Sequence, residues 1–250
     1  MADETLPVKT APFGWAAQYK DVEGTAAATT GGEGARAESI YVVSSRQELK
    51  DALSNVRSPN YLAGDATAEL AAKLEPKIIY WVGTIRGDDL GNGSYADATY
   101  YKTKPNKTTF DFDLYVKAFD KDYLEQLQAT IDAGGAEATA AQAELSLLKK
   151  QNDQRSQYAN NQKAQIQFQV PPNTTILGVG EDARLEEGYL SINTLSHTFN
   201  KTDNSNIIIR NITFQAAPRD FAPAWDAGDG ASGNWNARYD AVSINASKNV

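Results

Sequence analysis

The second half of the chain alternates short apolar runs with turn residues, a pattern typical of short strands joined by bends. LSIN at residues 190–193 and VSIN at residues 242–245 repeat one another, and RNI at residues 210–212 is a looser copy. Asparagine suits such bends because it adopts the left-handed conformation or bonds its own backbone. Strands this short, with connections of varying length, predict a β-solenoid with coils of about 20–30 residues. The predicted strands read QIQFQV, TTILGVG, YLSIN, NIIIRNITF and AVSIN.

The first half of the chain predicts two further strands and a short helix. Residues 77–85 read KIIYWVGTI, a continuous apolar run that suits a strand buried on both faces of a parallel sheet. Residues 40–43 are a shorter apolar run that predicts another strand. Ser45 is followed three residues later by Glu48, which is the pattern of a capping box. A short helix is therefore expected through Leu53.

Residues 113–160 change to a helical pattern that is interrupted at Gly134 and Gly135. We interpret this stretch as an amphipathic excursion packed on its own domain, with a coiled coil or a partner-binding helix as the alternative. The apolar positions that fall on one helical face are Leu124, Leu127 and Ile131 before the break and Leu145 and Leu148 after it.

Length and composition limit the classes of protein that the chain can belong to. Its 250 residues, 41% of them hydrophobic, suffice for one large all-β domain or two small ones. No stretch approaches the roughly 20 apolar residues that a membrane span needs. The absence of cysteine excludes a disulfide framework and a thiolate metal site. The first residues, MADETLPVKTAPFGWA, lack the basic and apolar regions of a signal peptide, and we interpret them as a mature start with an added Met.

The charge balance narrows the choice of partner. A net charge of −8 and a pI of about 4.8 argue against nucleic acid, which requires a basic surface. A polyanionic sugar would also be repelled, unless a divalent cation bridges the two sets of carboxylates or a local basic patch overrides the net charge.

The most distinctive stretch is residues 225–245, WDAGDGASGNWNARYDAVSIN. Asp240 stands at the start of an apolar strand, where a rigid element would hold its carboxylate toward the loop. Asp226, Asp229 and Asn236 add oxygen donors, the ligands that hard cations such as calcium prefer. Turn formation is the alternative interpretation, because Asp, Asn and Gly tolerate unusual backbone angles.

This stretch resembles a segment of bacterial pectate lyases (polysaccharide lyase family 1) that reads roughly FPxWDPTDGxxGxWNSxYDxISI. Three other stretches are similar to the same family: GTAAATTGGEGA before YVVSS, the strand PKIIYWVGTI, and NTTILGVGEDARLEEGYL. The resemblance covers most of residues 12–250, apart from the helical stretch and residues 194–205. His197, the only histidine, lies in that second exception, and we interpret it as a solvated loop residue.

The resemblance implies a right-handed parallel β-helix, an all-β fold with a helical excursion, formed by residues 1–250 as a single domain. It also implies a secreted, monomeric enzyme that acts on polygalacturonate and binds neither nucleic acid nor membrane. Such lyases cleave the α-1,4 linkage by β-elimination to give unsaturated oligogalacturonides. Ca²⁺ then serves as a Lewis acid.

The resemblance also assigns roles to individual residues. Asp240 corresponds to a primary ligand of the catalytic calcium. Asp229 and Asn236 correspond to positions that bind an accessory calcium or the sugar, and Arg238 is expected at the substrate. The family's catalytic Arg and remaining calcium ligands are expected after Val250, so no catalytic residue is predicted within this sequence, which we interpret as the N-terminal part of a longer enzyme.

Three alternatives stay open at this point. A pectin lyase would act on methylated substrate without calcium, which the acidic loop argues against. A glycoside hydrolase on the same solenoid fold would need two carboxylates flanking the scissile bond. A non-catalytic polyuronate-binding fragment becomes the best interpretation if the protein ends at Val250.

Overall fold

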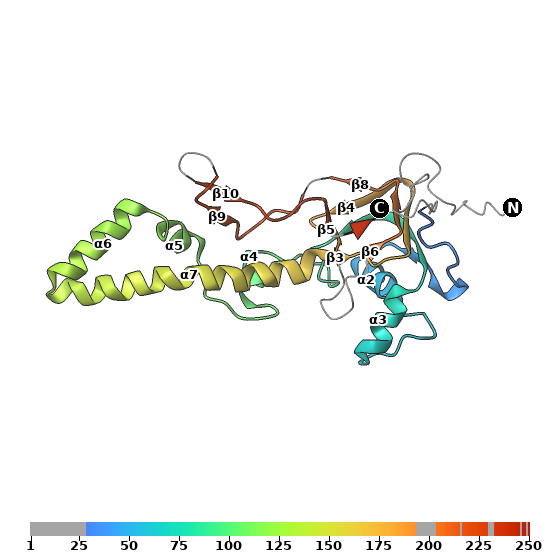
Figure 1. Cartoon of the computed structure of the whole chain (residues 1–250), viewed down its shortest axis with the longest axis horizontal. Helices are drawn as coiled ribbons and strands as arrows, with labels where there is room; N and C mark the ends of the chain where they lie inside the picture. The colour runs from blue at the N-terminus through green and yellow to red at the C-terminus, as the bar shows by residue number, and fades with distance from the viewer. Residues whose placement is uncertain (1–28, 194–203, 216, 230–232, 246, 249) are drawn as a thin grey trace, which may run out of the picture. The chain divides into compact units, whose positions relative to one another are not determined.

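The computed structural model describes residues 29–193, 204–215, 217–229, 233–245, 247–248 and 250. The expected N-terminal start and His197 lie outside these residues. The chain forms two units, and Figure 1 labels many of their elements. Unit 1 comprises Met1–Ser94, Ile166–Pro218 and Tyr239–Val250, and unit 2 comprises Tyr95–Gln165 and Arg219–Arg238.

Unit 1 consists mainly of short parallel strands, arranged in three sheets. The first sheet has the order β1 (Ile40–Val43), β2 (Lys77–Arg86), β4 (Thr174–Glu186) and β7 (Ile207–Arg210), and β8 (Thr213–Phe214) also pairs with β4. The second has the order β11 (Val242–Ile244), β5 (Tyr189–Ile192) and β3 (Gln167–Gln169). The third pairs β6 (Asn204–Ser205) with β12 (Ser247–Lys248).

The chain passes through these sheets in a repeating order. After β4 it enters β5 and then β6, and the next pass runs through β7 and β8, β11 and β12. Equivalent residues therefore stack from one pass to the next: Ile79 pairs with Tyr41 on one side and with Ile176 on the other. The predicted parallel strands are confirmed. The all-β class describes these strands but not unit 2, in which helices predominate.

Stacking of equivalent residues buries the same face of each strand. Tyr41, Ile79 and Ile176 are at most 2% exposed, and Trp81 and Leu190 are fully buried. Burial of one such aliphatic side chain contributes about 1.5–3 kcal/mol. The continuous run predicted at residues 77–85 is therefore a central strand, but it is not buried on both faces as expected, since Val82 on its other face is 40% exposed.

The predicted capping box opens helix α2 (Arg46–Ser54). The Ser45 hydroxyl accepts from the Glu48 amide, and the Glu48 carboxylate accepts from the Ser45 amide. The helix ends at Asn55, which is left-handed and fully buried. Its side chain accepts from the Tyr41 hydroxyl and donates to the Ala72 carbonyl at the end of α3 (Ala66–Leu74). The sequence pattern did not predict α3, whose apolar positions are mostly alanine.

Asparagine residues order the bends, though only partly at the expected positions. Asn211 is left-handed, as predicted from the RNI motif, but Asn193 and Asn245 are not. Asn173 and Asn206 adopt that conformation instead, just before β4 and β7. They stack on each other, because the Asn206 side chain donates to the Asn173 side chain at 2.9 Å. Left-handed asparagines therefore occur before strands, at Asn173 and Asn206, as well as after one, at Asn211.

The glycines of the TTGG loop are required by close packing. The Gly32 amide donates to the Thr175 hydroxyl at 2.8 Å. A Cβ on Gly32 would lie 2.0 Å from the Lys77 carbonyl oxygen, and one on Gly31 would lie 2.1 Å from the Thr175 hydroxyl. Gly31 also has a φ of +56°, where larger residues are strained.

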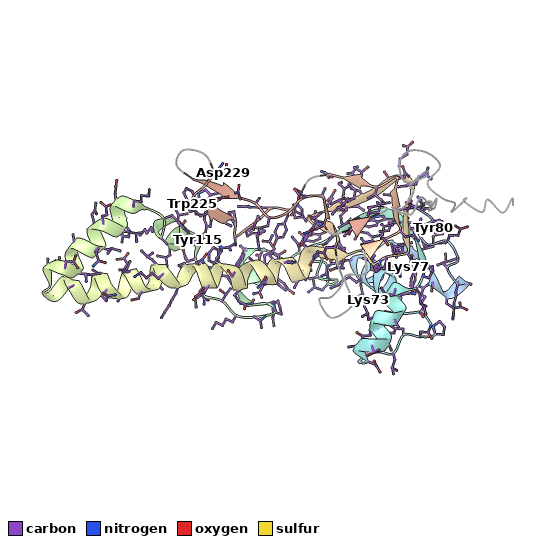
Figure 2. The ribbon with its side chains drawn as sticks, viewed as in Figure 1. Lys73, Lys77, Tyr80, Tyr115, Trp225 and Asp229 are labelled. Carbon is purple, nitrogen blue, oxygen red and sulfur yellow. The ribbon has the colours of Figure 1, made fainter. Side chains whose placement is uncertain are left out.

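Lys77 is a charged residue in the interior of unit 1, labelled in Figure 2. Its ammonium group donates to the carbonyls of Lys73 and Glu75 at 2.7 and 2.8 Å. Burial lowers its pKa to about 7, and the nearby Glu75 charge only partly opposes this shift. Burial favours the neutral amine because the interior solvates the ion poorly.

Unit 2 contains four helices and one antiparallel strand pair among its described residues. The helical stretch is wider than the predicted 113–160, because Asp97 caps an additional helix and the last helix continues to Ile166. No described helix combines the length and the hydropathy needed to cross a membrane. The elements are α4 (Ala98–Thr103), α5 (Phe112–Lys117), α6 (Lys121–Ala133), α7 (Ala136–Ile166), β9 (Ala224–Asp226) and β10 (Asn234–Asn236).

The apolar face predicted on the helical stretch packs within unit 2. Leu127 of α6 and Leu148 of α7 share one cluster, with Leu124 and Ile131 against it. Leu145 is also buried. The apolar positions that a partner helix would need are thus largely used inside the unit.

A buried ion pair joins Asp220 to Arg238, near the two ends of the second segment of unit 2, Arg219–Arg238. The Asp220 side chain is 1% exposed and accepts from the Arg238 guanidinium at 2.6 and 2.9 Å. It also accepts from the backbone amides of Arg238 and Ala222. Burial opposes ionisation of Asp220, but the hydrogen bonds and charge of Arg238 outweigh it and lower its pKa.

The pKa of Lys77 predicts that its contribution to stability depends on pH. The unfolded chain binds a proton that the folded chain lacks between about pH 7 and 10.5, so stability rises with pH in this window. The slope is at most about 1.4 kcal/mol per pH unit. In urea unfolding at several pH values, the wild type should gain stability over Lys77→Met as pH rises. Lys121→Met is the surface control, and equal pH dependence of wild type and Lys77→Met would contradict the assignment.

The buried Asp220–Arg238 pair predicts that a substitution of Asp220 that keeps its shape will still lower stability strongly. Asp220→Asn keeps the shape but leaves Arg238 without its counter-charge, and should destabilise the chain by about 3 kcal/mol at neutral pH. The contribution is complete above pH 3.8 and is lost as the pH falls below it towards the lowered pKa. Chemical denaturation should show the gap to wild type closing in acid. Asp113→Asn, an exposed carboxylate in the same unit, should have little effect; similar losses for both variants would contradict a special role for the pair.

Candidate functional site

The β9–β10 hairpin carries the acidic loop that the sequence singles out. Trp225 pairs with Trp235 across the two strands, and their rings lie 4.9 Å apart at 63°. Trp225 also contacts Phe119, with ring centroids at 5.6 Å. Figure 2 shows Trp225 and Asp229 on the same hairpin. The aromatic packing gives the loop a defined base, although most loop side chains are exposed.

Asp226 and Asn236 hold the hairpin together. One Asp226 oxygen accepts from the Gly228 amide at 2.9 Å, and the other accepts from the Asn236 side-chain nitrogen at 3.2 Å. Turn formation therefore explains Asp226. Asn236 is partly used in the same way, since its amide nitrogen is engaged while its amide oxygen has no hydrogen bond within the described part of the chain.

Asp229 and Asp240 are different, because their carboxylates are exposed and have no hydrogen bond or ion pair among the described residues. Asp240 nevertheless has a fixed backbone. The next residue, Ala241, accepts from the Leu190 amide at 3.1 Å, and the preceding Tyr239 ring lies 5.2 Å from that of Tyr189. A carboxylate held in this way can bind a cation without losing an internal contact.

Arg238 was predicted at the substrate, but its guanidinium is bound to Asp220 through Nε and a terminal nitrogen. These bonds anchor the chain two residues before Asp240. Asp220 was not predicted from the sequence, because nothing local marks a carboxylate that becomes buried through a partner 18 residues away. A substrate contact for Arg238 stays a prediction.

The predicted calcium ligands do not form a complete metal site among the described residues. No group of three or more Asp, Glu, His or Cys side chains within them is arranged to hold a metal. Asp229 and Asn236 belong to unit 2 and Asp240 to unit 1. Since calcium takes 6–8 oxygen ligands, these residues supply individual donors only.

Comparison with known proteins identifies the family. Residues 125–250 match a family model described as pectate lyase. A pectate lyase of Bacillus subtilis (strain 168) is 34% identical over 228 residues, which are 89% of this chain and 41% of that protein. Pectate lyase E of Dickeya chrysanthemi is 38% identical over 91 residues, which are 36% of this chain and 20% of that protein.

Solved structures agree with the sequence comparisons. A pectate lyase bound to hexasaccharide is similar with a TM-score of 0.64 and 32% identity, covering 99% of this chain and 48% of that one. A polygalacturonate lyase fused with a self-assembling amphipathic peptide has a TM-score of 0.65 and 30% identity, covering 98% of this chain and 48% of that one. The chain spans less than half the length of these relatives. With half of the chain matched by the family model and most of it matched by a relative, the chain belongs to the pectate lyase family.

Proposed function

We propose that this chain belongs to a calcium-dependent pectate lyase. The enzyme cleaves α-1,4-linked polygalacturonate by β-elimination to unsaturated oligogalacturonides. The observation that carries the proposal is the match to a pectate lyase over 89% of the chain. A similar structure is described as bound to hexasaccharide, and another is named a polygalacturonate lyase. We also propose that the protein is secreted and monomeric.

The fold proposed for this activity is a right-handed parallel β-helix. Its support is the repeating order of three parallel sheets in unit 1 and the register that stacks equivalent residues. Similarity to solved pectate lyases adds to that support. A solenoid suits a polymer because each pass adds one rung to an extended surface.

Asp240 is the proposed primary calcium ligand in this chain, with Asp229 and Asn236 at an accessory calcium or the sugar. Calcium bound at a uronate carboxylate would act as a Lewis acid and make the proton that β-elimination removes more acidic. Exposed carboxylates without internal partners support these roles for Asp229 and Asp240. We propose no residue of this chain as the base.

Arg238 has a more indirect proposed role. Its bonds to Asp220 hold the backbone of unit 2 two residues before Asp240. Its guanidinium group is also proposed to contact a uronate carboxylate of the substrate. The Arg238 side chain is 27% exposed.

The alternative activities have less support. The family model and the relatives named above are pectate lyases, not pectin lyases or hydrolases. Incubating the full-length protein that contains this chain with polygalacturonate and calcium, and following unsaturated product in the ultraviolet, tests the proposal. Binding without product would favour the non-catalytic polyuronate-binding fragment, and product from methylated pectin without calcium would favour a pectin lyase.

Asp240→Ala should weaken calcium binding, because the change removes one of the 6–8 oxygen ligands that calcium takes. The fold should be little affected, because the Asp240 side chain is exposed. In the full-length enzyme, activity on polygalacturonate should fall steeply and be restored only partly by excess calcium. Calcium titration of product formation, with calorimetric calcium binding in parallel, measures both effects. Asp182→Ala, another exposed carboxylate of unit 1, is the control. The same calcium dependence in Asp240→Ala and the parent would show that the assignment is wrong.

Asp229→Asn should raise KM for polygalacturonate while leaving kcat and the fold nearly unchanged. The variant keeps the size of the side chain and removes only a charge that would bind an accessory cation or the sugar. Steady-state kinetics at fixed calcium measures the change, with Asp122→Asn, exposed on α6, as the control. An unchanged KM would count against a substrate role for Asp229.

A further inference from the structure

Unit 2 contains a pocket of about 400 Å³ between α5, α7 and β9. Its walls differ in character, with aromatic residues on one side and basic or amide side chains from one helix on the other. None of the residues proposed above as calcium ligands lines it. The residues that line it include Tyr115, Phe119, Trp225, Lys149, Asn152 and Arg155.

The aromatic wall is partly open. Phe119 and Trp225 are half-buried, with ring centroids 5.6 Å apart and planes at 34°. Tyr115 packs edge-on against Phe119 at 5.1 Å and is itself buried. Its hydroxyl accepts from the Trp225 amide at 3.4 Å, which ties the two elements together (Figure 2). Aromatic rings fixed in this way offer an apolar face to a ligand that is polar at its edges.

The opposite wall comes from α7. Lys149, Asn152 and Arg155 follow one another at intervals of three residues and therefore lie along one side of the helix. Arg155 is half-buried, and its guanidinium donates to the Ala222 carbonyl at 3.2 Å and lies 5.9 Å from the Tyr115 ring centre. Its Nε is buried and has no hydrogen-bond partner among the residues that the structure describes. Within the described part of the chain, neither Lys149 nor Arg155 forms an ion pair with a carboxylate.

The sign of the charge is informative because the protein as a whole is acidic. The chain has a net charge of −8, yet none of the described Asp and Glu residues lines this pocket. A concave site lined by one sign of charge concentrates the potential and attracts ions of opposite sign. The pocket therefore suits an anion, and it supplies the local basic patch that an acidic protein needs to bind a polyanionic sugar.

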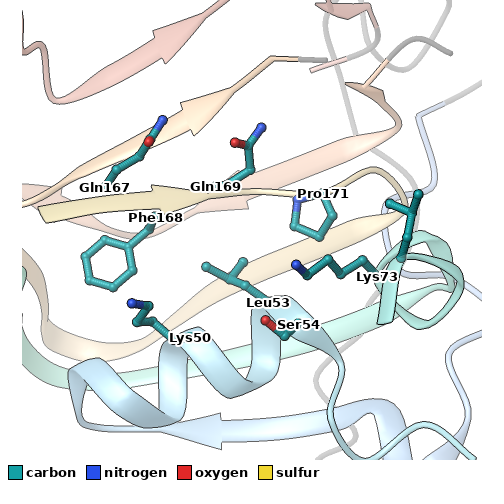
Figure 3. Close-up of a pocket in the computed structure, with 9 residues that line it drawn as sticks. Lys50, Leu53, Ser54, Lys73, Gln167, Phe168, Gln169 and Pro171 are labelled. Atoms are coloured by element: carbon teal, nitrogen blue, oxygen red, sulfur yellow. The ribbon is translucent and has the colours of Figure 1, made fainter. Parts of the chain in front are cut away.

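A second pocket with two lysines shows what distinguishes this one. It lies in unit 1 between α2, α3 and β3, has a volume of about 270 Å³, and includes Lys50 and Lys73 (Figure 3). The one aromatic residue among the described residues that line it, Phe168, is 1% exposed and belongs to the core. The amide nitrogen of Gln169 is already bonded to Asn193 at 2.6 Å. That pocket offers positive charge but no open aromatic face.

We propose that the unit 2 pocket binds one acidic sugar residue of a uronate oligosaccharide. The sugar ring lies against Phe119 and Trp225, and its carboxylate faces Lys149 and Arg155. Asn152 is placed to bond a hydroxyl group. The assignment of the sugar as galacturonate rests on the proposed function, whereas the site itself rests on the pocket and needs no calcium.

The test is a binding titration of the full chain with trigalacturonate in the presence of EDTA, followed by tryptophan fluorescence. Because Trp225 lines the pocket, binding should change its emission. Affinity should fall as salt is raised, since the attraction is between charges. Neutral galactotriose should not bind. Absence of trigalacturonate binding in EDTA would overturn the proposal, and so would sulfate binding as tightly as trigalacturonate, because a simple anion site would not select a sugar.

A pair of neighbouring lysines provides matched variants. Lys149→Gln removes an exposed charge that lines the pocket and should weaken trigalacturonate binding about tenfold, the effect of losing one charge-assisted hydrogen bond. Lys150→Gln makes the same change on the next residue of α7, which does not line the pocket, and should leave the affinity unchanged. Phe119→Leu, which keeps an apolar side chain but removes the ring, should also weaken binding. Equal affinities in the two lysine variants would overturn the proposal.

The two proposals fail in different ways. Trigalacturonate binding in EDTA, without any lyase product from the full-length protein in calcium, would overturn the proposed function and leave the pocket in place. Lyase activity without EDTA-resistant binding would overturn the pocket alone.

Discussion

Parallel backbone pairing between successive passes of the chain is the constraint on which unit 1 depends. Because each strand lies in register with the strand of the previous pass, Tyr41, Ile79 and Ile176 bury the same face in turn. Parallel strands require long connections, and the connection from β2 to β3 contains the helical part of unit 2. A large insertion is tolerated there because it leaves the pairing of the strands unchanged.

The polar groups of this architecture are used in two ways. Some satisfy the fold itself, such as the stacked Asn173 and Asn206 at the bends, the buried Lys77 and the Asp220–Arg238 pair. Others, such as Asp229 and Asp240, make no described internal bond and are exposed. Groups of the second kind can bind a ligand without breaking a bond that stabilises the fold.

The acidic composition raises an electrostatic problem for the proposed binding of a polyuronate. A negatively charged chain and a polyuronate repel each other, and such repulsion has to be relieved locally. A cation at exposed carboxylates is one proposed means, and the pocket lined by Lys149 and Arg155 is the second. The two means are physically independent, since one depends on bound calcium and the other on fixed side-chain charges.

The sequence by itself determined the features that depend on near neighbours. The strands, the Ser45–Glu48 capping box and the helical stretch broken at Gly134 and Gly135 are local patterns, and a long unusual motif was enough to indicate the family. Only the tertiary structure showed that Asp220 buries its charge against Arg238. Likewise, only the structure showed that three aromatic residues and one side of α7 enclose a pocket. Such features could not be predicted because burial and pairing depend on segments that are distant in sequence, and those segments meet only when the chain has folded.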